Sequence, residues 1–161
     1  EIGMNKPDFL NELRKFLVEA NKAGYAAGEK AKVVDGPDGS HTITHESADG
    51  RWKYHDEYYG GEPYGGREVV SVDGKGVWMM VYYGWVIPGV DHSSIYKFLQ
   101  EALRVETNDE PYRGPRLYEA RGMKYANSYT GEPDCFTGEE EIYWGGMKVY
   151  SARYMGGLVN Q

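Results

Sequence analysis

The sequence predicts an α+β protein made of two similar helix-plus-antiparallel-sheet units, an internal duplication related by a pseudo-twofold axis. Three observations support this fold class. The stretches Gly66–Gly84 and Gly138–Gly156 have the same length, and their glycines, glutamates and aromatic residues fall in step. An amphipathic helical pattern precedes each group of strand-like segments. The composition, with 15 Tyr, 4 Trp and 22 Gly, is typical of aromatic strands joined by tight turns.

The first unit begins with a helix that we expect to start at Pro7, with Asn5 or Lys6 before it and Gly24 as its stop. Its apolar stripe comprises Phe9, Leu13, Phe16, Leu17 and Ala20. A loop at 35–39 separates this helix from the strands. Strand-like segments follow at 41–45, 51–58, 67–72 and 77–83, the last two forming a hairpin around the turn "DGKG".

The second unit repeats this order. Asp91 or Ser93 can cap a second amphipathic helix, whose apolar stripe comprises Ile95, Phe98, Leu99, Ala102 and Leu103. An acidic loop comes next, and strand-like segments are expected at 112–120, 123–129, 138–144 and 148–155. The turn "YRGP" contains Arg113, which could pair with an acidic neighbour.

Residues of the two units match at a nearly constant offset. Tyr54 matches Tyr125 at an offset of 71, and Glu68 matches Glu140 at 72, so one inserted residue in the glycine loop explains the change. We therefore predict a single domain over 1–161, with repeat units at 6–88 and 91–159. The pattern leaves open whether the two sheets join or pack on one another.

Alternation along the strands assigns the acidic residues to faces. Side chains two apart share a face, so Asp56 and Glu68 lie on the aromatic face of the first unit. Asn127 and Glu140 take the matching positions in the second unit. A carboxylate on an inward face is unfavourable unless it is paired or hydrogen-bonded.

Two interpretations of the inward glutamates remain open. In the structural one, each accepts hydrogen bonds from a glycine loop or from a tyrosine hydroxyl. In the functional one, they line a cleft that suits a flat or cationic organic molecule. Because the glutamates match, both are expected to have the same role. The candidate ligand-binding residues are Asp56, Glu68, Trp78, Tyr82, Asn127, Glu140, Tyr150 and Tyr154.

Composition excludes several classes of function. A net charge of −7 and a pI near 5.1 disfavour direct binding of nucleic acid. No apolar run reaches the length of a membrane span, no secretory signal is present, and the single cysteine, Cys135, is consistent with a reducing cytoplasm. His41 and His45 would lie roughly 13 Å apart on a strand, too far to share one metal ion. We therefore expect a cytoplasmic protein with no metal, no cofactor and no membrane association.

Several motifs resemble an uncharacterised prokaryotic family, catalogued as a domain of unknown function and often associated with XRE-type transcriptional regulators. They are "AGYA", "YHDEYYGG", "GGREVV", "VWMMVYYG", "YRGP", "FTGEEEIY" and "VYSARYMGG". In fused members of that family a helix-turn-helix domain precedes this one, which implies a sensor module. The first helix of this chain already belongs to the module, so a regulatory role would require a partner.

The predicted function is a small-molecule binding or sensor module for a cationic or aromatic ligand. One alternative is a hydrolase in which Glu68 or Glu140 acts as a general base on water. Another is a protein-interaction domain with no ligand pocket. The expected partners are a small-molecule ligand and either a regulator or a second copy of the chain.

Overall fold

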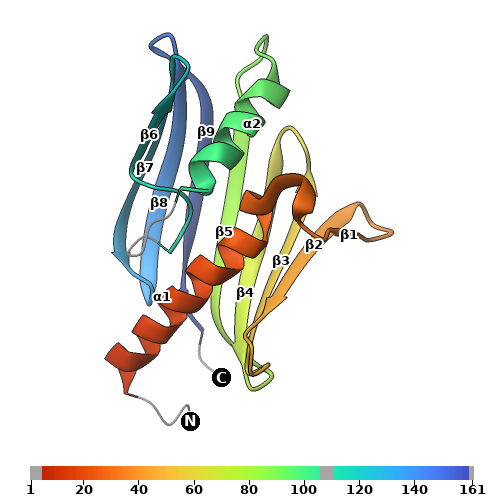
Figure 1. Cartoon of the computed structure of the whole chain (residues 1–161), viewed down its shortest axis with the longest axis vertical. Coiled ribbons are helices and arrows are strands. Elements are labelled where there is room, and N and C mark those ends of the chain that lie inside the picture. The colour runs from red at the N-terminus through yellow and green to blue at the C-terminus, as the bar shows by residue number, and fades with distance from the viewer. Residues whose placement is uncertain (1–4, 106–110, 160–161) are drawn as a thin grey trace.

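The computed structural model describes residues 5–105 and 111–159, so the predicted acidic loop lies largely outside the described residues. Strands of the described residues form one antiparallel sheet in the order β1-β2-β3-β4-β5-β9-β8-β7-β6. Both α-helices lie on one face of this sheet (Figure 1). The strands are β1 Val34–Asp35, β2 Ser40–Glu46, β3 Trp52–Gly60, β4 Tyr64–Val72, β5 Lys75–Val86, β6 Leu117–Ala120, β7 Met123–Glu132, β8 Cys135–Trp144 and β9 Met147–Leu158.

The two helices begin where their capping residues predict. In α1, Lys6–Ala23, the Asn5 side chain accepts a hydrogen bond of 3.0 Å from the backbone of Asp8. In α2, His92–Leu103, Asp91 accepts one of 3.2 Å from Ser93. The apolar stripe of α1 is buried as predicted, and in α2 only Leu103 stays partly exposed. A short 3₁₀ helix, η1 Tyr25–Lys30, follows α1.

The prediction of two helix-plus-antiparallel-sheet units is wrong: the strands of the described residues form a single nine-stranded sheet. The last strands of the two predicted units, β5 and β9, pair antiparallel from Trp78 opposite Leu158 to Val86 opposite Tyr150. An unpaired strand edge exposes backbone N–H and C=O groups, and this pairing removes two such edges at once. The sheet interior is continuous for that reason.

The core also crosses the junction between β5 and β9. The apolar cluster under α1 contains Trp78 and Tyr82 from β5 together with Phe136 from β8 and Tyr154 from β9. A second cluster under α2 joins Phe98 and other helix residues to β7, β8 and β9. Helix α1 is therefore anchored on strands that the sequence assigned to both units.

The segment 111–116 is not the strand that the sequence predicts, since β6 begins only at Leu117. It crosses the inner side of β7 instead. The backbone N–H of Gly114 donates to the Tyr125 hydroxyl at 3.2 Å, and Asn127 donates to the Gly114 carbonyl at 3.0 Å. Because its backbone is bonded to side chains of β7, this segment covers part of the sheet and forms one wall of the site described below.

Candidate functional site

A cavity of about 240 Å³ lies between the inner face of the sheet and the elements that cover it. Tyrosines dominate its lining, which also contains two carboxyl groups and one guanidinium. The lining residues are Asn21, Tyr54, Asp56, Tyr58, Gly60, Gly61, Tyr64, Glu68, Tyr82, Tyr96, Leu103, Tyr112 and Arg113.

Two buried carboxyl groups lie side by side in this lining. Asp56 on β3 and Glu68 on β4 are directly opposite each other in the strand register, and they are 5% and 4% exposed. The Tyr82 hydroxyl donates to Oδ1 of Asp56 at 2.5 Å. The Tyr54 hydroxyl is within hydrogen-bonding reach of the Glu68 carboxyl. Among the described residues, these tyrosines are the hydrogen-bond donors to the pair.

Burial changes the proton affinity of this carboxyl pair. Burial, together with the neighbouring charge of Asp56, raises the pKa of Glu68 to about 8. Burial also raises the pKa of Asp56 to about 6, although the Tyr82 hydroxyl and Arg113 act in the opposite direction. Near neutral pH the two carboxyl groups therefore hold about one proton between them.

The proton held by Glu68 predicts how stability depends on pH. The folded pKa of about 8 is above the ordinary value of 4.5, so the folded chain binds the extra proton. The stability from this group is complete below the unfolded pKa and is lost as the pH rises through about 8. At about pH 9, the free energy of unfolding of Glu68→Gln should therefore exceed that of the wild type by on the order of a few kcal/mol. The variant should accordingly unfold at a higher urea concentration.

Urea titrations at about pH 5 and about pH 9 would measure this difference. The groups facing Glu68 are Asp56, Tyr54, Arg113 and Glu140, and all remain in the variant. Glu139→Gln, at an exposed position of β8, is the matched control and should follow the wild type. Parallel profiles for Glu68→Gln and the wild type would show that Glu68 ionises normally.

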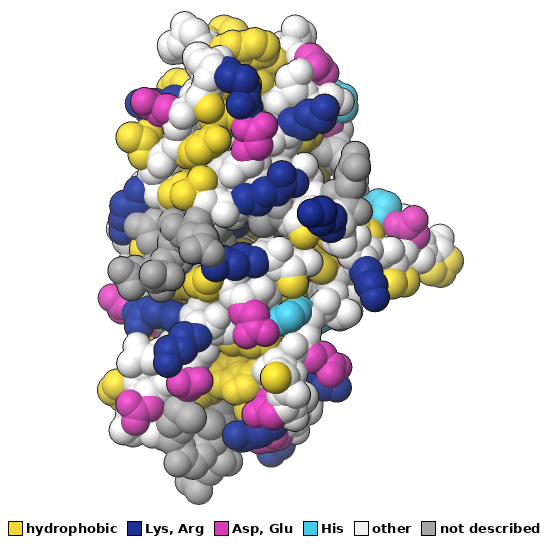
Figure 2. All heavy atoms as spheres, in the orientation of Figure 1, with side chains coloured by type: hydrophobic (Ala, Val, Ile, Leu, Met, Phe, Trp, Pro, Cys, Tyr) yellow, Lys and Arg dark blue, Asp and Glu magenta, His cyan; other side chains and the backbone are white. Residues whose placement is uncertain are grey.

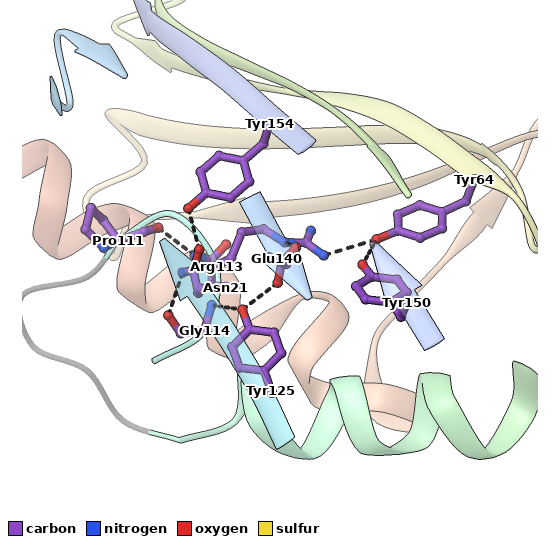
Figure 3. A network of polar contacts seen from close by, with 10 residues as sticks. Asn21, Tyr64, Pro111, Arg113, Gly114, Tyr125, Glu140, Tyr150 and Tyr154 are labelled. Atoms are coloured by element: carbon purple, nitrogen blue, oxygen red, sulfur yellow. Dashed lines mark hydrogen bonds and ion pairs between the residues drawn. The ribbon is translucent and has the colours of Figure 1, made fainter. Parts of the chain in front are cut away.

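Arg113 joins the cavity to a second polar network (Figure 3). Its Nε donates to Oε1 of Glu140 at 2.6 Å, and its Nη2 donates to the Tyr64 hydroxyl at 3.3 Å. The Tyr64 hydroxyl is also 2.5 Å from that of Tyr150. Burial alone would lower the pKa of Arg113, but the charge of Glu140 and the surrounding tyrosines hold it well above its usual range. Arg113 is therefore a charged, buried partner of Glu140.

The two inward glutamates have similar tyrosines but different cationic partners. Glu140 accepts a 2.5 Å hydrogen bond from Tyr125 through Oε2 and one from Arg113 through Oε1. Glu68 has the equivalent tyrosine, Tyr54, but no arginine or lysine bonded to it among the described residues. Both glutamates therefore have the tyrosine partner of the structural interpretation, and Glu68 in addition faces the cavity.

The residues opposite the two glutamates, Asn127 and Asp56, also have similar tyrosine partners but differ in their other contacts. Asn127 lies opposite Glu140 and accepts a 2.6 Å hydrogen bond from the Tyr154 hydroxyl, as Asp56 accepts one from Tyr82. The amide of Asn127 also donates to Gly114, which belongs to the covering segment. Asp56 lines the cavity, whereas Asn127 is bonded to the covering segment.

The structure separates the predicted site residues into three groups. Asp56, Glu68 and Tyr82 line the cavity. The network beside it contains Asn127, Glu140, Tyr150 and Tyr154. Trp78 belongs to neither group, because it is fully buried in the core, stacked on Phe136.

Other cavity residues were not among the predicted site residues. Tyr54 and Tyr58 could have been predicted from the sequence, since strand alternation places them on the same aromatic face as Asp56. Asn21, Tyr96 and Tyr112 come from α1, α2 and the covering segment, and no local pattern links them to the sheet. Arg113 was expected to pair with an acidic neighbour, but its partner is 27 positions away.

The surface around the helices carries both signs of charge. Figure 2 shows Lys and Arg side chains from the top to the bottom of the helix-bearing face, with Asp and Glu side chains interspersed among them. The acidic character of the cavity therefore comes from its own buried carboxyl groups. In the described part of the chain, no group of three or more His, Cys, Asp or Glu residues could hold a metal ion. No described helix is long and apolar enough to span a membrane.

The fold and the site together define an α+β protein, mainly antiparallel sheet, with a tyrosine- and carboxyl-lined cavity beneath its helices. The chain belongs to the family described as a domain of unknown function (DUF5680), whose model matches residues 56–159. The match begins at Asp56 and includes Glu68, Arg113 and Glu140. Comparison with curated proteins and with solved structures gave no match.

Proposed function

We propose that this protein binds a small organic cation with an apolar or aromatic body. The observation that carries the proposal is the cavity in which Asp56 and Glu68 lie side by side. Arg113 is the cation among the described lining residues, and its charge is balanced by Glu140. A bound cation would balance the remaining carboxyl charge, and the tyrosine rings would supply contact area and ring-face attraction.

The geometry favours binding over hydrolysis by a glutamate base. Glu140 is buried, is paired with Arg113 and is not in the lining of the cavity, so a substrate in the cavity would not contact it. The raised pKa of Glu68 keeps this group protonated near neutral pH, the wrong state for a general base. The cavity itself favours a ligand over an interaction domain that has no pocket.

A sensor role in a transcriptional regulator is part of the same proposal. The regulatory signal would be the occupancy of the cavity, passed to a partner regulator or to a second copy of the chain. Its support is the family resemblance and the position of the cavity against α1, α2 and the covering segment. These elements contribute Asn21, Tyr96 and Tyr112 to the lining of the cavity.

Calorimetry and thermal unfolding with benzylamine, benzamidine and phenyltrimethylammonium test this function, with benzyl alcohol as the neutral control. The cations should raise the unfolding temperature, since a ligand at a hundred times its Kd stabilises by about 2.7 kcal/mol. Glu68→Gln and Asp56→Asn should lose most of this effect. Glu57→Gln should retain it, because Glu57 is next to Asp56 on β3 and points to the other face of the sheet.

Two results would contradict the proposal. One is that none of the three cations stabilises the wild type more than benzyl alcohol does. The other is that Glu68→Gln and Glu57→Gln respond to the cations equally, which would place binding outside the cavity.

A further inference from the structure

The chain supplies its own example of what an inward glutamate of this sheet binds. Glu140 holds the guanidinium of Arg113 through Oε1, while its tyrosine, Tyr125, donates to Oε2. Glu68 and Tyr54 form the corresponding pair at the cavity. We infer that the ligand presents a planar guanidinium or amidinium group to Glu68. This inference rests on the proposed function and specifies the class of cation.

The surroundings of Glu68 favour a planar cation over an ammonium ion. A guanidinium or amidinium offers parallel N–H donors that match the two oxygens of a carboxylate, whereas an ammonium ion acts as a point charge. Planar cations also stack on aromatic rings. Arg113 shows this arrangement, with its guanidinium carbon 5.5 Å from the centre of the Tyr82 ring. Tyr82 lines the cavity as well, and Tyr54, Tyr58 and Tyr64 supply further rings.

Asp56 adds a second requirement on the ligand. At the corresponding position of the other network, the amide of Asn127 donates to the carbonyl of Gly114. An ionised Asp56 has no proton to donate, and its Oδ1 already accepts from Tyr82. Oδ2 of Asp56 accepts no hydrogen bond from the described residues, so it favours a ligand with a further N–H or O–H donor near the planar cation. This donor is secondary, because the cationic group binds at Glu68 and displaces the proton that Glu68 holds near neutral pH.

Three probes of similar size and shape isolate the planar cation. Benzamidine is planar and charged, benzylamine carries an ammonium charge, and benzamide is planar but neutral. We expect the Kd of benzamidine, measured by calorimetry, to be at least about tenfold lower than that of benzylamine. Benzamide should not bind measurably. In Glu68→Gln the preference for benzamidine should disappear, and in Asp56→Asn it should persist with weaker overall binding.

The outcomes separate this inference from the proposed function. Benzylamine binding as tightly as benzamidine, or more tightly, with both lost in Glu68→Gln, would overturn the planar-cation inference and leave the proposed function intact. The absence of binding by either cation would overturn both. A preference for benzamidine that survives in Glu68→Gln would place the planar cation on another residue and also contradict the inference.

Discussion

Replacing Arg113 by alanine is expected to destabilise the protein by about 3–5 kcal/mol, because it leaves a buried carboxylate without its cation. The Glu140 side chain is 0% exposed and that of Arg113 is 9% exposed, so this ion pair is shielded from bulk water. The same change removes the hydrogen bond to the Tyr64 hydroxyl. Urea-induced unfolding followed by tryptophan fluorescence would measure the loss.

Two further variants make this result specific. Arg51→Ala breaks an exposed ion pair with Asp73 and should have little effect, since such pairs are screened by water. Adding Glu140→Leu to Arg113→Ala should recover part of the stability, because the unpaired buried charge is then gone. If Arg113→Ala were as mild as Arg51→Ala, the buried ion pair would not be a structural element of the fold.

Replacing Trp78 by alanine is expected to cost about 3–5 kcal/mol of stability, the usual range for a large buried aromatic side chain. Trp78 is 0% exposed, its ring is stacked 5.8 Å from that of Phe136, and its indole N–H donates to the Pro133 carbonyl at 3.0 Å. The alanine variant would leave a cavity in the core and an unsatisfied carbonyl. Denaturant unfolding measures the loss.

The milder variant Trp78→Phe tests whether this residue has any part in binding. It should unfold at lower denaturant than the wild type and bind benzamidine with unchanged Kd, because Trp78 is not in the cavity lining. Trp85→Ala is a matched control on the same strand; Trp85 is half-buried beside Tyr83, so its loss should be smaller. If Trp78→Phe lost benzamidine binding as fully as Glu68→Gln, Trp78 would have to be counted among the binding residues.

Local patterns were sufficient for the helices and for the faces of the strands. Asn5, Asp91 and the apolar stripes define the helices through contacts within a few residues. Alternation placed Glu68 and Glu140 on the inner face, and both are buried there. These predictions succeeded because helical spacing and strand alternation depend on neighbouring residues alone.

The resemblance to a domain of unknown function was confirmed over residues 56–159, and the association with XRE-type regulators stays a prediction. The fold built from the repeat was wrong in its architecture. Matched residues in two segments do not say whether the segments form separate sheets. Whether the strands form one sheet or two depended on β5 and β9. Their backbone N–H and C=O groups pair with each other along Trp78–Val86 and Tyr150–Leu158, which joins the strands into one sheet.

The sequence by itself determined which side chains face inward, including the two glutamates, Asp56 and Asn127. Only the tertiary structure decided that these matched positions differ. The segment 111–116 crosses β7, so Arg113 reaches Glu140 and Gly114 reaches Asn127, while Asp56 and Glu68 remain beside a cavity. The physical reason is that a buried charge takes its partner from whatever segment packs against it, and such packing joins residues far apart in the chain.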